Sequence, residues 1–245
     1  MQPPVVEVLN EAGRAPYVLV CEHAANHLPP AYGSLGLGAA DLSRHIGWDI
    51  GAAAVARALS ALIDAPLVLA GYSRLLIDLN RPPGSATSIP AISEATVIPG
   101  NQDLSAPEVQ SRIDGYFTPF HSRLAGVMAA RLAAKRPTAL IAVHSFTPVF
   151  LGVERPWAAG ILYRRSQRFG AALVDALGGA PAAVAHNQPY QIDDGSDYTV
   201  PVHGEALGLE AVLVEISQGL LADRQGTDDW ANRLAGALVA CQPLV

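Results

Sequence analysis

Residues 17–23 are Tyr17-Val18-Leu19-Val20-Cys21-Glu22-His23, so five apolar residues run directly into a charged pair. An uninterrupted apolar run of this length is typical of a parallel strand that is covered on both faces. Comparable short runs recur along the chain, at 67–69, 75–79, 139–143, 160–163, 182–185 and 211–216. The sequence therefore predicts a sheet of buried strands.

Longer stretches with apolar residues three or four positions apart separate these runs and predict helices. They cover residues 49–63, 107–135 and 166–177, and a closing helix carries Trp230, Leu234 and Leu238. Pro119 lies inside the second helix and predicts a kink or a break there, because proline removes a backbone donor. Strands and helices alternate without a break in composition. This predicts one α/β domain over 1–245, with a mostly parallel central sheet flanked by helices.

The composition excludes several classes of protein. Half of the 245 residues are hydrophobic, 16% are charged and the net charge is −6, which argues against a disordered chain and against a nucleic-acid partner. No stretch reaches the ~18 uninterrupted apolar residues of a membrane span, and the N-terminus shows no signal peptide. The two cysteines are too few for a disulfide framework. We expect a cytoplasmic protein without nucleic-acid or membrane partners, and the sequence allows a homo-oligomer.

Polar side chains follow four of the predicted strands at the point where each strand ends. They are Glu22 with His23, Asn80 with Arg81, His144, and Glu215. Open α/β sheets bind ligands at the carboxyl ends of their strands. We therefore expect these side chains to meet in one site.

His23 and His144 are the natural pair of metal ligands in this set, since a catalytic zinc site takes three protein ligands and keeps one position open. Asp49 is the expected third ligand, because it follows the first loop and opens a predicted helix. Glu22 and Asn26 compete for this place. The alternatives without a metal are an N-cap role for Asp49 and two histidines that are simply satisfied in the core.

Glu215 lies inside the apolar run 211–216. Burying a carboxylate costs several kcal/mol unless a cation or hydrogen bonds compensate, and burial raises its pKa toward the range of a general base. We expect Glu215 to be catalytic; the alternative is a structural pair with an arginine.

Two arginines flank one predicted strand and suit a substrate that carries carboxylates, since guanidinium binds carboxylate with two parallel hydrogen bonds. Arg74 is expected at the reacting group, and Arg81 with Asn80 at a substrate carboxylate. Asp78 lies between the arginines and could support either of them. His203, in the loop before the Glu215 strand, is a further candidate for substrate contact. The alternative for the arginines is a surface pair with Asp78.

At these residues the chain resembles the N-formylglutamate amidohydrolase family, in six segments that appear in the family's order between residues 20 and 220. The segments are Cys21-Glu22-His23-Ala24-Ala25-Asn26, Gly47-Trp48-Asp49-Ile50-Gly51-Ala52, Ser73-Arg74 through Asn80-Arg81-Pro82, Val97-Ile98-Pro99-Gly100-Asn101, Ala142-Val143-His144-Ser145-Phe146 and Val214-Glu215-Ile216. Each alone is weakly specific, but six in order are strongly specific.

The resemblance implies a zinc-exopeptidase architecture with one zinc ion. It also implies hydrolysis of the amide of an N-acyl acidic amino acid, such as N-formyl-L-glutamate, to formate and the amino acid. Histidine breakdown is the pathway it implies. The chain also resembles zinc carboxypeptidases, in which a metal-binding histidine, an arginine, an Asn-Arg pair, a second metal-binding histidine and a catalytic glutamate follow one another. The corresponding residues here, in the same order, are His23, Arg74, Asn80-Arg81, His144 and Glu215.

The chain departs from these patterns at two places. Asn26 stands where zinc carboxypeptidases place a glutamate ligand, which moves the expected third ligand to Asp49. Ser217 and Gly219 stand where the family commonly has an arginine and an aspartate, which puts the identity of the acyl substrate in question. The rival functions are a zinc amidase for another N-acyl amino acid or a cell-wall peptide, a non-catalytic binding protein, and a metal-free serine or cysteine hydrolase.

Overall fold

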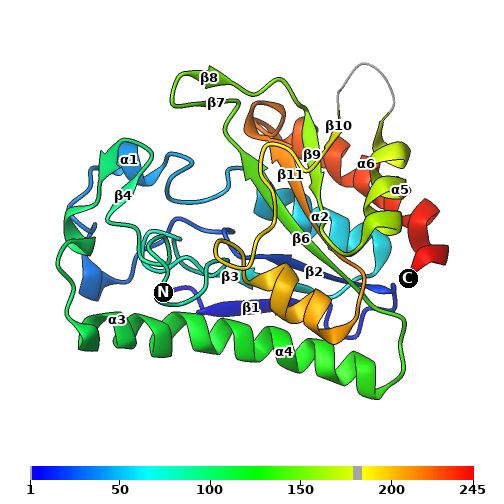
Figure 1. The fold of residues 1–245 in the computed structure, drawn as a ribbon, viewed down its shortest axis with the longest axis horizontal. Helices are drawn as coiled ribbons and strands as arrows, with labels where there is room; N and C mark the ends of the chain where they lie inside the picture. Colours follow the sequence, from blue (N-terminus) through cyan, green and yellow to red (C-terminus); the bar gives the residue numbers. More distant parts are fainter. Residues whose placement is uncertain (1, 179–183) are drawn as a thin grey trace.

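A seven-stranded sheet in the order β1-β3-β2-β6-β11-β9-β10 forms the centre of the computed structural model, which describes residues 2–178 and 184–245 (Figure 1). The strands are β1 (Val6–Leu9), β2 (Tyr17–Cys21), β3 (Leu67–Ala70), β6 (Ala139–Phe146), β9 (Ala159–Leu162), β10 (Val184–His186) and β11 (Ala211–Ser217). The four central strands β3, β2, β6 and β11 are parallel, whereas β1 and β9 pair antiparallel with their inner neighbours. The predicted α/β fold with a mostly parallel sheet is confirmed.

Helices cover both faces of the sheet (Figure 1). One face packs against α2 (Ala52–Ile63), α5 (Gln167–Leu177) and α6 (Arg224–Cys241), and the other against α4 (Thr118–Ala133), which continues from α3 (Ala106–Arg112). A short helix, α1 (Ala39–Leu42), lies away from the sheet. The helices make the sheet the middle of three layers.

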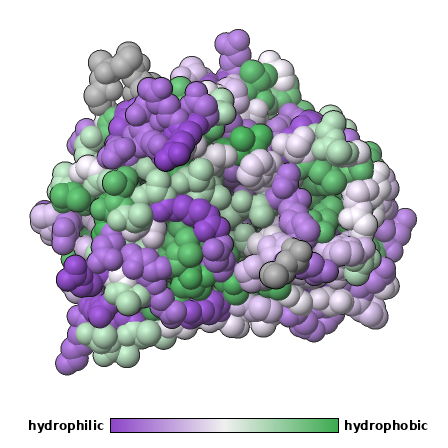
Figure 2. All heavy atoms as spheres, turned by 180° about the vertical axis from the view of Figure 1, so that it is seen from behind, coloured by the Kyte–Doolittle hydropathy of each residue, from purple (hydrophilic) through white to green (hydrophobic). Residues whose placement is uncertain are grey.

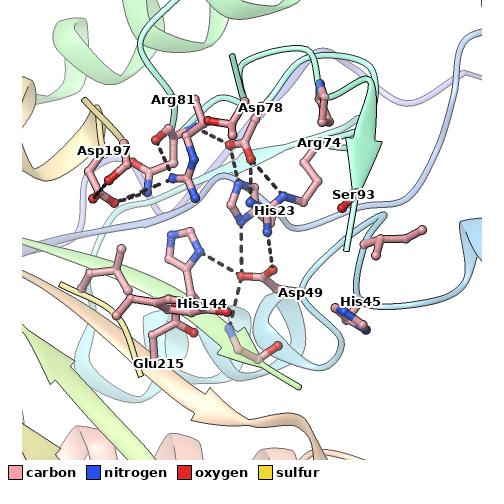
Figure 3. Close-up of a pocket in the computed structure, with 18 of the residues that line it drawn as sticks. His23, His45, Asp49, Arg74, Asp78, Arg81, Ser93, His144, Asp197 and Glu215 are labelled. Carbon is pink, nitrogen blue, oxygen red and sulfur yellow. Dashed lines mark hydrogen bonds and ion pairs between the residues drawn. The ribbon is translucent and has the colours of Figure 1, made fainter. Parts of the chain in front are cut away.

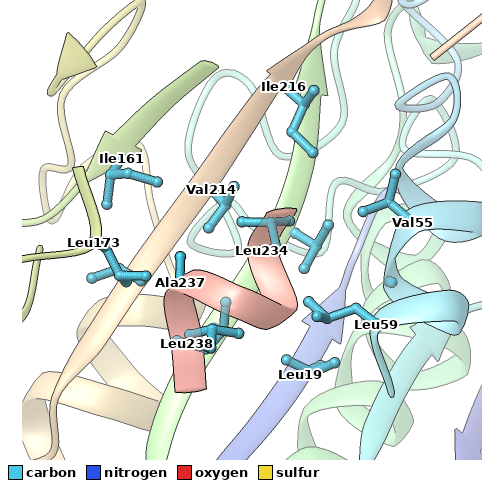
Figure 4. Close-up of a cluster of buried hydrophobic side chains, with 14 of the residues drawn as sticks. Leu19, Val55, Leu59, Ile161, Leu173, Val214, Ile216, Leu234, Ala237 and Leu238 are labelled. Atoms are coloured by element: carbon cyan, nitrogen blue, oxygen red, sulfur yellow. The ribbon is translucent and has the colours of Figure 1, made fainter. Parts of the chain in front are cut away.

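Alternate residues of one strand serve the two cores, which explains why the central strands consist mostly of apolar residues. Leu19 and Val214 point to the α2 and α6 side, where they pack with Leu59 and Leu234 (Figure 4). Val18, the neighbour of Leu19 in β2, points to the α4 side. Each such side chain contributes roughly 1.5–3 kcal/mol when it is fully buried. A polar residue in one of these strands therefore requires a compensating partner.

The prediction of a strand at residues 75–79 is wrong. This segment is buried and apolar, and Leu75 and Leu76 are fully buried, but it forms turns. Its carbonyl groups are satisfied by side chains, because Asn101 Nδ2 donates to Leu75 O at 2.8 Å and Arg112 Nη1 donates to Leu76 O at 2.9 Å. Buried backbone groups must be paired, and here polar side chains replace a neighbouring strand.

Two other elements differ in part from expectation. Strand β1 at the edge of the sheet was not predicted. The predicted strand at 182–185 begins at residues 182 and 183, which lie outside the described residues, and its second half belongs to β10.

The predicted long helix is present, and Pro119 does not break it (Figure 1). A π-helical turn at Ile113–Phe117 joins α3 to α4, and Pro119 occupies the first turn of α4. At the end of the π turn the N–H of Thr118 bonds to Ile113 O, one residue farther back than in an α-helix. The wider turn accommodates a residue that lacks a backbone donor.

Two hairpins flank the carboxyl ends of the parallel strands, β4 (Ile92–Ser93) with β5 (Thr96–Val97) and β7 (Val149–Phe150) with β8 (Val153–Glu154). The molecule seen from behind carries hydrophilic and hydrophobic residues intermixed (Figure 2). Within 2–178 and 184–245, none of the helices combines the length and the apolar character that crossing a membrane requires.

Candidate active site

Parallel strands deliver the central groups of this site to one edge of the sheet. His23 follows β2 directly, and His144 and Glu215 occupy paired positions near the carboxyl ends of β6 and β11. All three are almost completely buried, with 2%, 2% and 6% of their surface exposed. The expectation that the strand ends meet is confirmed for these residues (Figure 3).

Asp49 lies between the two histidines. Its Oδ2 is 3.3 Å from His23 Nδ1 and 2.8 Å from His144 Nδ1, and it accepts the backbone N–H of Ser145 at 3.2 Å. The N-cap position of α2 belongs to Gly51, so Asp49 is not the helix cap. One ligand atom from each of His23, Asp49 and His144 can be chosen so that the three lie within 4.8 Å of one another.

A second carboxylate stands behind each histidine. His23 Nε2 is 2.7 Å from Asp78 Oδ1, and His144 Nε2 is 3.0 Å from Glu22 Oε2. Asp78 is itself bound by Arg74, whose Nε and Nη2 donate to Asp78 Oδ2 at 2.9 and 2.6 Å. Histidine ligands of metals usually donate their other ring nitrogen to a carboxylate in this way.

The two other candidates for a third ligand are placed differently. Glu22 contacts His144 on the side opposite to Asp49, and Asn26 donates its amide to Leu42 O at 3.1 Å. The Arg74–Asp78 pair that the sequence suggested is present, but it is part of the site rather than a surface pair.

The donor set fits a divalent cation. A neutral imidazole that donates from Nε2 turns the lone pair of Nδ1 toward Asp49, so acceptors face each other unless a positive charge lies between them. Four carboxylates, Glu22, Asp49, Asp78 and Glu215, are buried here, and Arg74 is the arginine that forms ion pairs with two of them, Asp49 and Asp78. Burial opposes the charged form of His144, but Glu22 and Asp49 outweigh it and hold the pKa of that histidine well above its usual range. The site therefore favours positive charge at its centre.

Glu215 is the carboxylate without a partner. Its Oε2 has no hydrogen-bond partner among the described residues, and burial together with the nearby Asp49 charge raises the pKa of Glu215 to about 7. A carboxyl group with this pKa can both accept and return a proton near neutral pH.

These groups form the floor of a pocket of about 440 Å³. Its walls come from the β4–β5 hairpin with Ile92 and Glu94, from Phe150 of the β7–β8 hairpin, and from Tyr190. Nothing in the sequence pattern pointed to Phe150 or Tyr190, because both lie outside the motifs and reach the pocket only through the fold.

Asn80 and Arg81 both line the pocket. Arg81 lies beside Asp197 in Figure 3. The Asn80 amide is occupied: Nδ2 donates to Asp197 at 3.1 Å, and Oδ1 accepts the N–H groups of Tyr198 and Thr199. Asn80 thereby holds the 197–199 segment in place. Arg81 keeps 23% of its side chain exposed and has a long contact of 3.9 Å with Asp197.

His203 does not line this pocket. It lies in a π-helical turn at Val200–Gly204 and stacks on His121 of α4, with His203 Nε2 2.9 Å from His121 Nδ1. His121 Nε2 in turn lies 2.8 Å from Leu79 O. The structure gives His203 a place in the core beside His121, not at the expected substrate contact.

The His121–His203 pair predicts sensitivity to acid. Burial lowers the pKa of both histidines from 6.5 to about 4, so they are neutral in the folded protein. The unfolded chain takes up protons below about 6.5, and the free energy of unfolding should therefore fall as the pH is lowered from about 6.5 to about 4. A shift of this size corresponds to roughly 3 kcal/mol per histidine. Urea denaturation at pH 7.5 and at pH 5 measures the loss.

His203→Phe is the matched variant, because it removes one titrating group and keeps a ring against His121. We expect the variant to lose less stability than the wild type between the two pH values. An equal loss in both proteins would contradict a role for the pair.

Comparisons with known proteins identify the family of this chain. The family model for N-formylglutamate amidohydrolase matches residues 15–222, which include every strand from β2 to β11. The chain belongs to the N-formylglutamate amidohydrolase family. The search of curated proteins found no match.

Two solved structures resemble this family member over nearly their whole length. A gene product of Agrobacterium tumefaciens has 39% sequence identity and a TM-score of 0.95, with 99% of this chain and 96% of that chain covered. An N-formylglutamate amidohydrolase from Ralstonia eutropha JMP134 has 19% identity and a TM-score of 0.73, with 98% and 97% covered. The second structure shows that an N-formylglutamate amidohydrolase has this fold.

Proposed function

We propose that this member of the family is a zinc-dependent amidohydrolase that cleaves the amide of an N-acyl acidic amino acid, such as N-formyl-L-glutamate, to formate and the amino acid. The observation that carries the proposal is the approach of two buried histidines to Asp49 on the floor of a pocket, next to a carboxylate without a partner. The family supports hydrolysis of an amide.

The residues that would hold one zinc ion are His23 and His144, each through Nδ1, and Asp49. Asp78 and Glu22 accept the Nε2–H of the two histidines, which selects the tautomer with a free lone pair on Nδ1. Zinc at this place supplies a Lewis acid for the carbonyl oxygen and lowers the pKa of water toward ~7.

Glu215 is the proposed general base and acid. Its free carboxylate oxygen accepts a proton from the attacking water as the C–O bond forms at the acyl carbon. When the C–N bond breaks, the same oxygen returns the proton to the leaving amine. A pKa near neutrality suits both transfers.

The arginines have separate proposed roles. Arg74 is held by Asp78 and lies 3.5 Å from Asp49, and it would stabilise the negative charge that develops on the acyl oxygen. Arg81 would bind a carboxylate of the substrate, with Asn80 holding the adjoining 197–199 segment. A cytoplasmic location and a role in amino-acid degradation remain predictions from the sequence.

A second candidate substrate is a different N-acyl amino acid. Ser217 and Gly219, at and just after the end of β11, carry no charge where the family commonly has an arginine and an aspartate. This change affects recognition of the substrate and leaves the proposed metal and proton-transfer groups intact.

Formate release from N-formyl-L-glutamate by zinc-loaded protein tests the proposal. We expect one formate per glutamate, loss of release after chelation and recovery when zinc is restored, because the chemistry depends on the metal. A panel of other N-formyl and N-acetyl amino acids serves as the control for substrate. Release that survives complete removal of metal would exclude the mechanism. No release of formate from protein with stoichiometric zinc would exclude the substrate.

A further inference from the structure

One arginine beside the pocket differs from the others in its partners. Arg74, Arg81 and Arg44 each contact a carboxylate, of Asp78, Asp197 and Glu94 respectively. Arg155 makes no ion pair within 4.0 Å among residues 2–178 and 184–245. Aromatic rings hold it instead, since its guanidinium carbon lies 4.5 Å from the centre of the Phe150 ring and 4.8 Å from that of Tyr190.

The fold brings this arginine to the side of the pocket that carries Glu215. The N–H of Ser217 donates to Ala158 O at 2.9 Å, so the segment that follows Arg155 runs beside the end of β11. The Arg155 N–H also donates to Pro148 O at 2.8 Å, which closes the β7–β8 hairpin and holds the backbone at this position.

A glycine allows Tyr190 to reach the same place. Gly160 of β9 pairs with Glu215, and a Cβ at Gly160 would lie 1.6 Å from Gln188 O. The backbone before Tyr190 therefore packs directly on the sheet next to Glu215, and this contact requires glycine. Tyr190 and Phe150 both line the pocket.

The hydrogen bond between the side chains of Arg155 and Tyr190 leaves both with hydrogen-bond donors for a further acceptor. Arg155 Nη1 donates to Tyr190 Oη at 2.8 Å, so the tyrosine hydroxyl hydrogen is available for another acceptor. Burial, with the nearby Glu215 charge, raises the pKa of Tyr190, which keeps this hydrogen in place at neutral pH. Guanidinium has five N–H donors, so the bond to Tyr190 Oη leaves Arg155 with further donors.

We propose that Arg155 and Tyr190 form a carboxylate-binding subsite of the pocket, which selects substrates with an acidic side chain. Tyr190 lines the pocket and its hydroxyl would supply a neutral donor, and Arg155, hydrogen-bonded to that hydroxyl, would supply the charge. Together with Arg81, the subsite provides two guanidinium groups for the two carboxylates of an N-acyl dicarboxylic amino acid. That the subsite selects a substrate rests on the proposed function, whereas its binding of a carboxylate does not.

The test compares Arg155→Gln and Tyr190→Phe with the wild type in the zinc-loaded protein. Loss of a charge-assisted contact is expected to raise KM for N-formyl-L-glutamate by about 10–100-fold in Arg155→Gln and less in Tyr190→Phe, with little change in kcat. The same variants should leave KM unchanged for N-formyl-L-norvaline, which keeps the α-carboxylate but has an uncharged side chain, so that discrimination between the two substrates falls. Arg155→Lys keeps the charge and should recover part of the affinity. Arg224→Gln, whose side chain is 93% exposed on α6, is the control.

Calorimetry with glutarate separates this subsite from the proposed reaction. We expect Arg155→Gln to weaken glutarate binding by about 10–100-fold. If the wild type binds glutarate through Arg155 but hydrolyses no N-formyl-L-glutamate, the subsite stands and the proposed reaction fails. If the wild type hydrolyses the substrate, yet Arg155→Gln changes neither glutarate affinity nor discrimination, the subsite is refuted and the reaction stands. A wild type that binds no glutarate and prefers no acidic substrate also refutes the subsite.

Discussion

Turnover of N-formyl-L-glutamate is expected to fall by about 10²–10⁴-fold when Glu215 is replaced by glutamine, because a general base contributes a factor of this size. The amide keeps the shape of the side chain but cannot accept the proton from water. Glu215 lies beside the His23–Asp49–His144 group without being one of its members, so the variant should bind zinc as the wild type does. Steady-state kinetics and the zinc content of the same sample measure both effects.

Glu154→Gln is the matched control for this variant. Glu154 is an exposed glutamate of β8, and its replacement should change neither turnover nor zinc content. If Glu215→Gln retained most of its activity, the proposed role of Glu215 would be wrong. Loss of zinc from Glu215→Gln would instead indicate that this carboxylate helps to hold the metal.

Replacing Asp49 with alanine should lower the affinity for zinc more than replacing Glu22 with glutamine. Asp49 is the carboxylate that both Nδ1 atoms face, whereas Glu22 contacts only the far nitrogen of His144. Removal of a carboxylate behind a histidine ligand typically weakens metal binding by about 10–100-fold, which is the expected effect of Glu22→Gln. Asp49→Ala should exceed this range. Competition with a zinc-binding dye gives the affinities.

Thermal unfolding gives a second measure that does not depend on activity. Zinc should raise the Tm of the wild type, since a ligand that binds only the folded state stabilises it, and this increase should disappear in Asp49→Ala. Asn26→Ala is the control, because its amide contacts Leu42 O and not the histidines. Retention of zinc by Asp49→Ala together with its loss from Asn26→Ala would identify Asn26 as the third ligand.

The local pattern of apolar residues was sufficient to predict the central strands and the edge where the site lies. The runs at 17–21, 139–143 and 211–216 become β2, β6 and β11 because strands covered on both faces are apolar at almost every position. Parallel direction then places His23, His144 and Glu215 at one edge without further information.

The same reasoning wrongly predicted a strand at 75–79. The apolar character of this segment shows that it is buried, but it does not show which groups pair with its backbone. Whether Leu75 and Leu76 form a strand depends on which groups satisfy their carbonyls. These groups belong to Asn101 and Arg112, which lie 26 and 36 positions later. The expected substrate contact of His203 was not found for a related reason. Its position in the chain just before the Glu215 strand does not determine which way its ring points.

From the order of residues alone, the fold class and the set of candidate groups follow, because both depend on periodicity and on strand ends. Asp49 was already the expected third ligand from the sequence, but its approach to both histidines and the pairing of Glu22 with His144 depend on the tertiary structure. So does the approach of Arg155 to the rings of Phe150 and Tyr190. Glu22 and His144 are 122 positions apart, and Arg155 and Tyr190 are 35 apart. Contacts at such separations arise only when strands and loops pack together, and no local pattern encodes them.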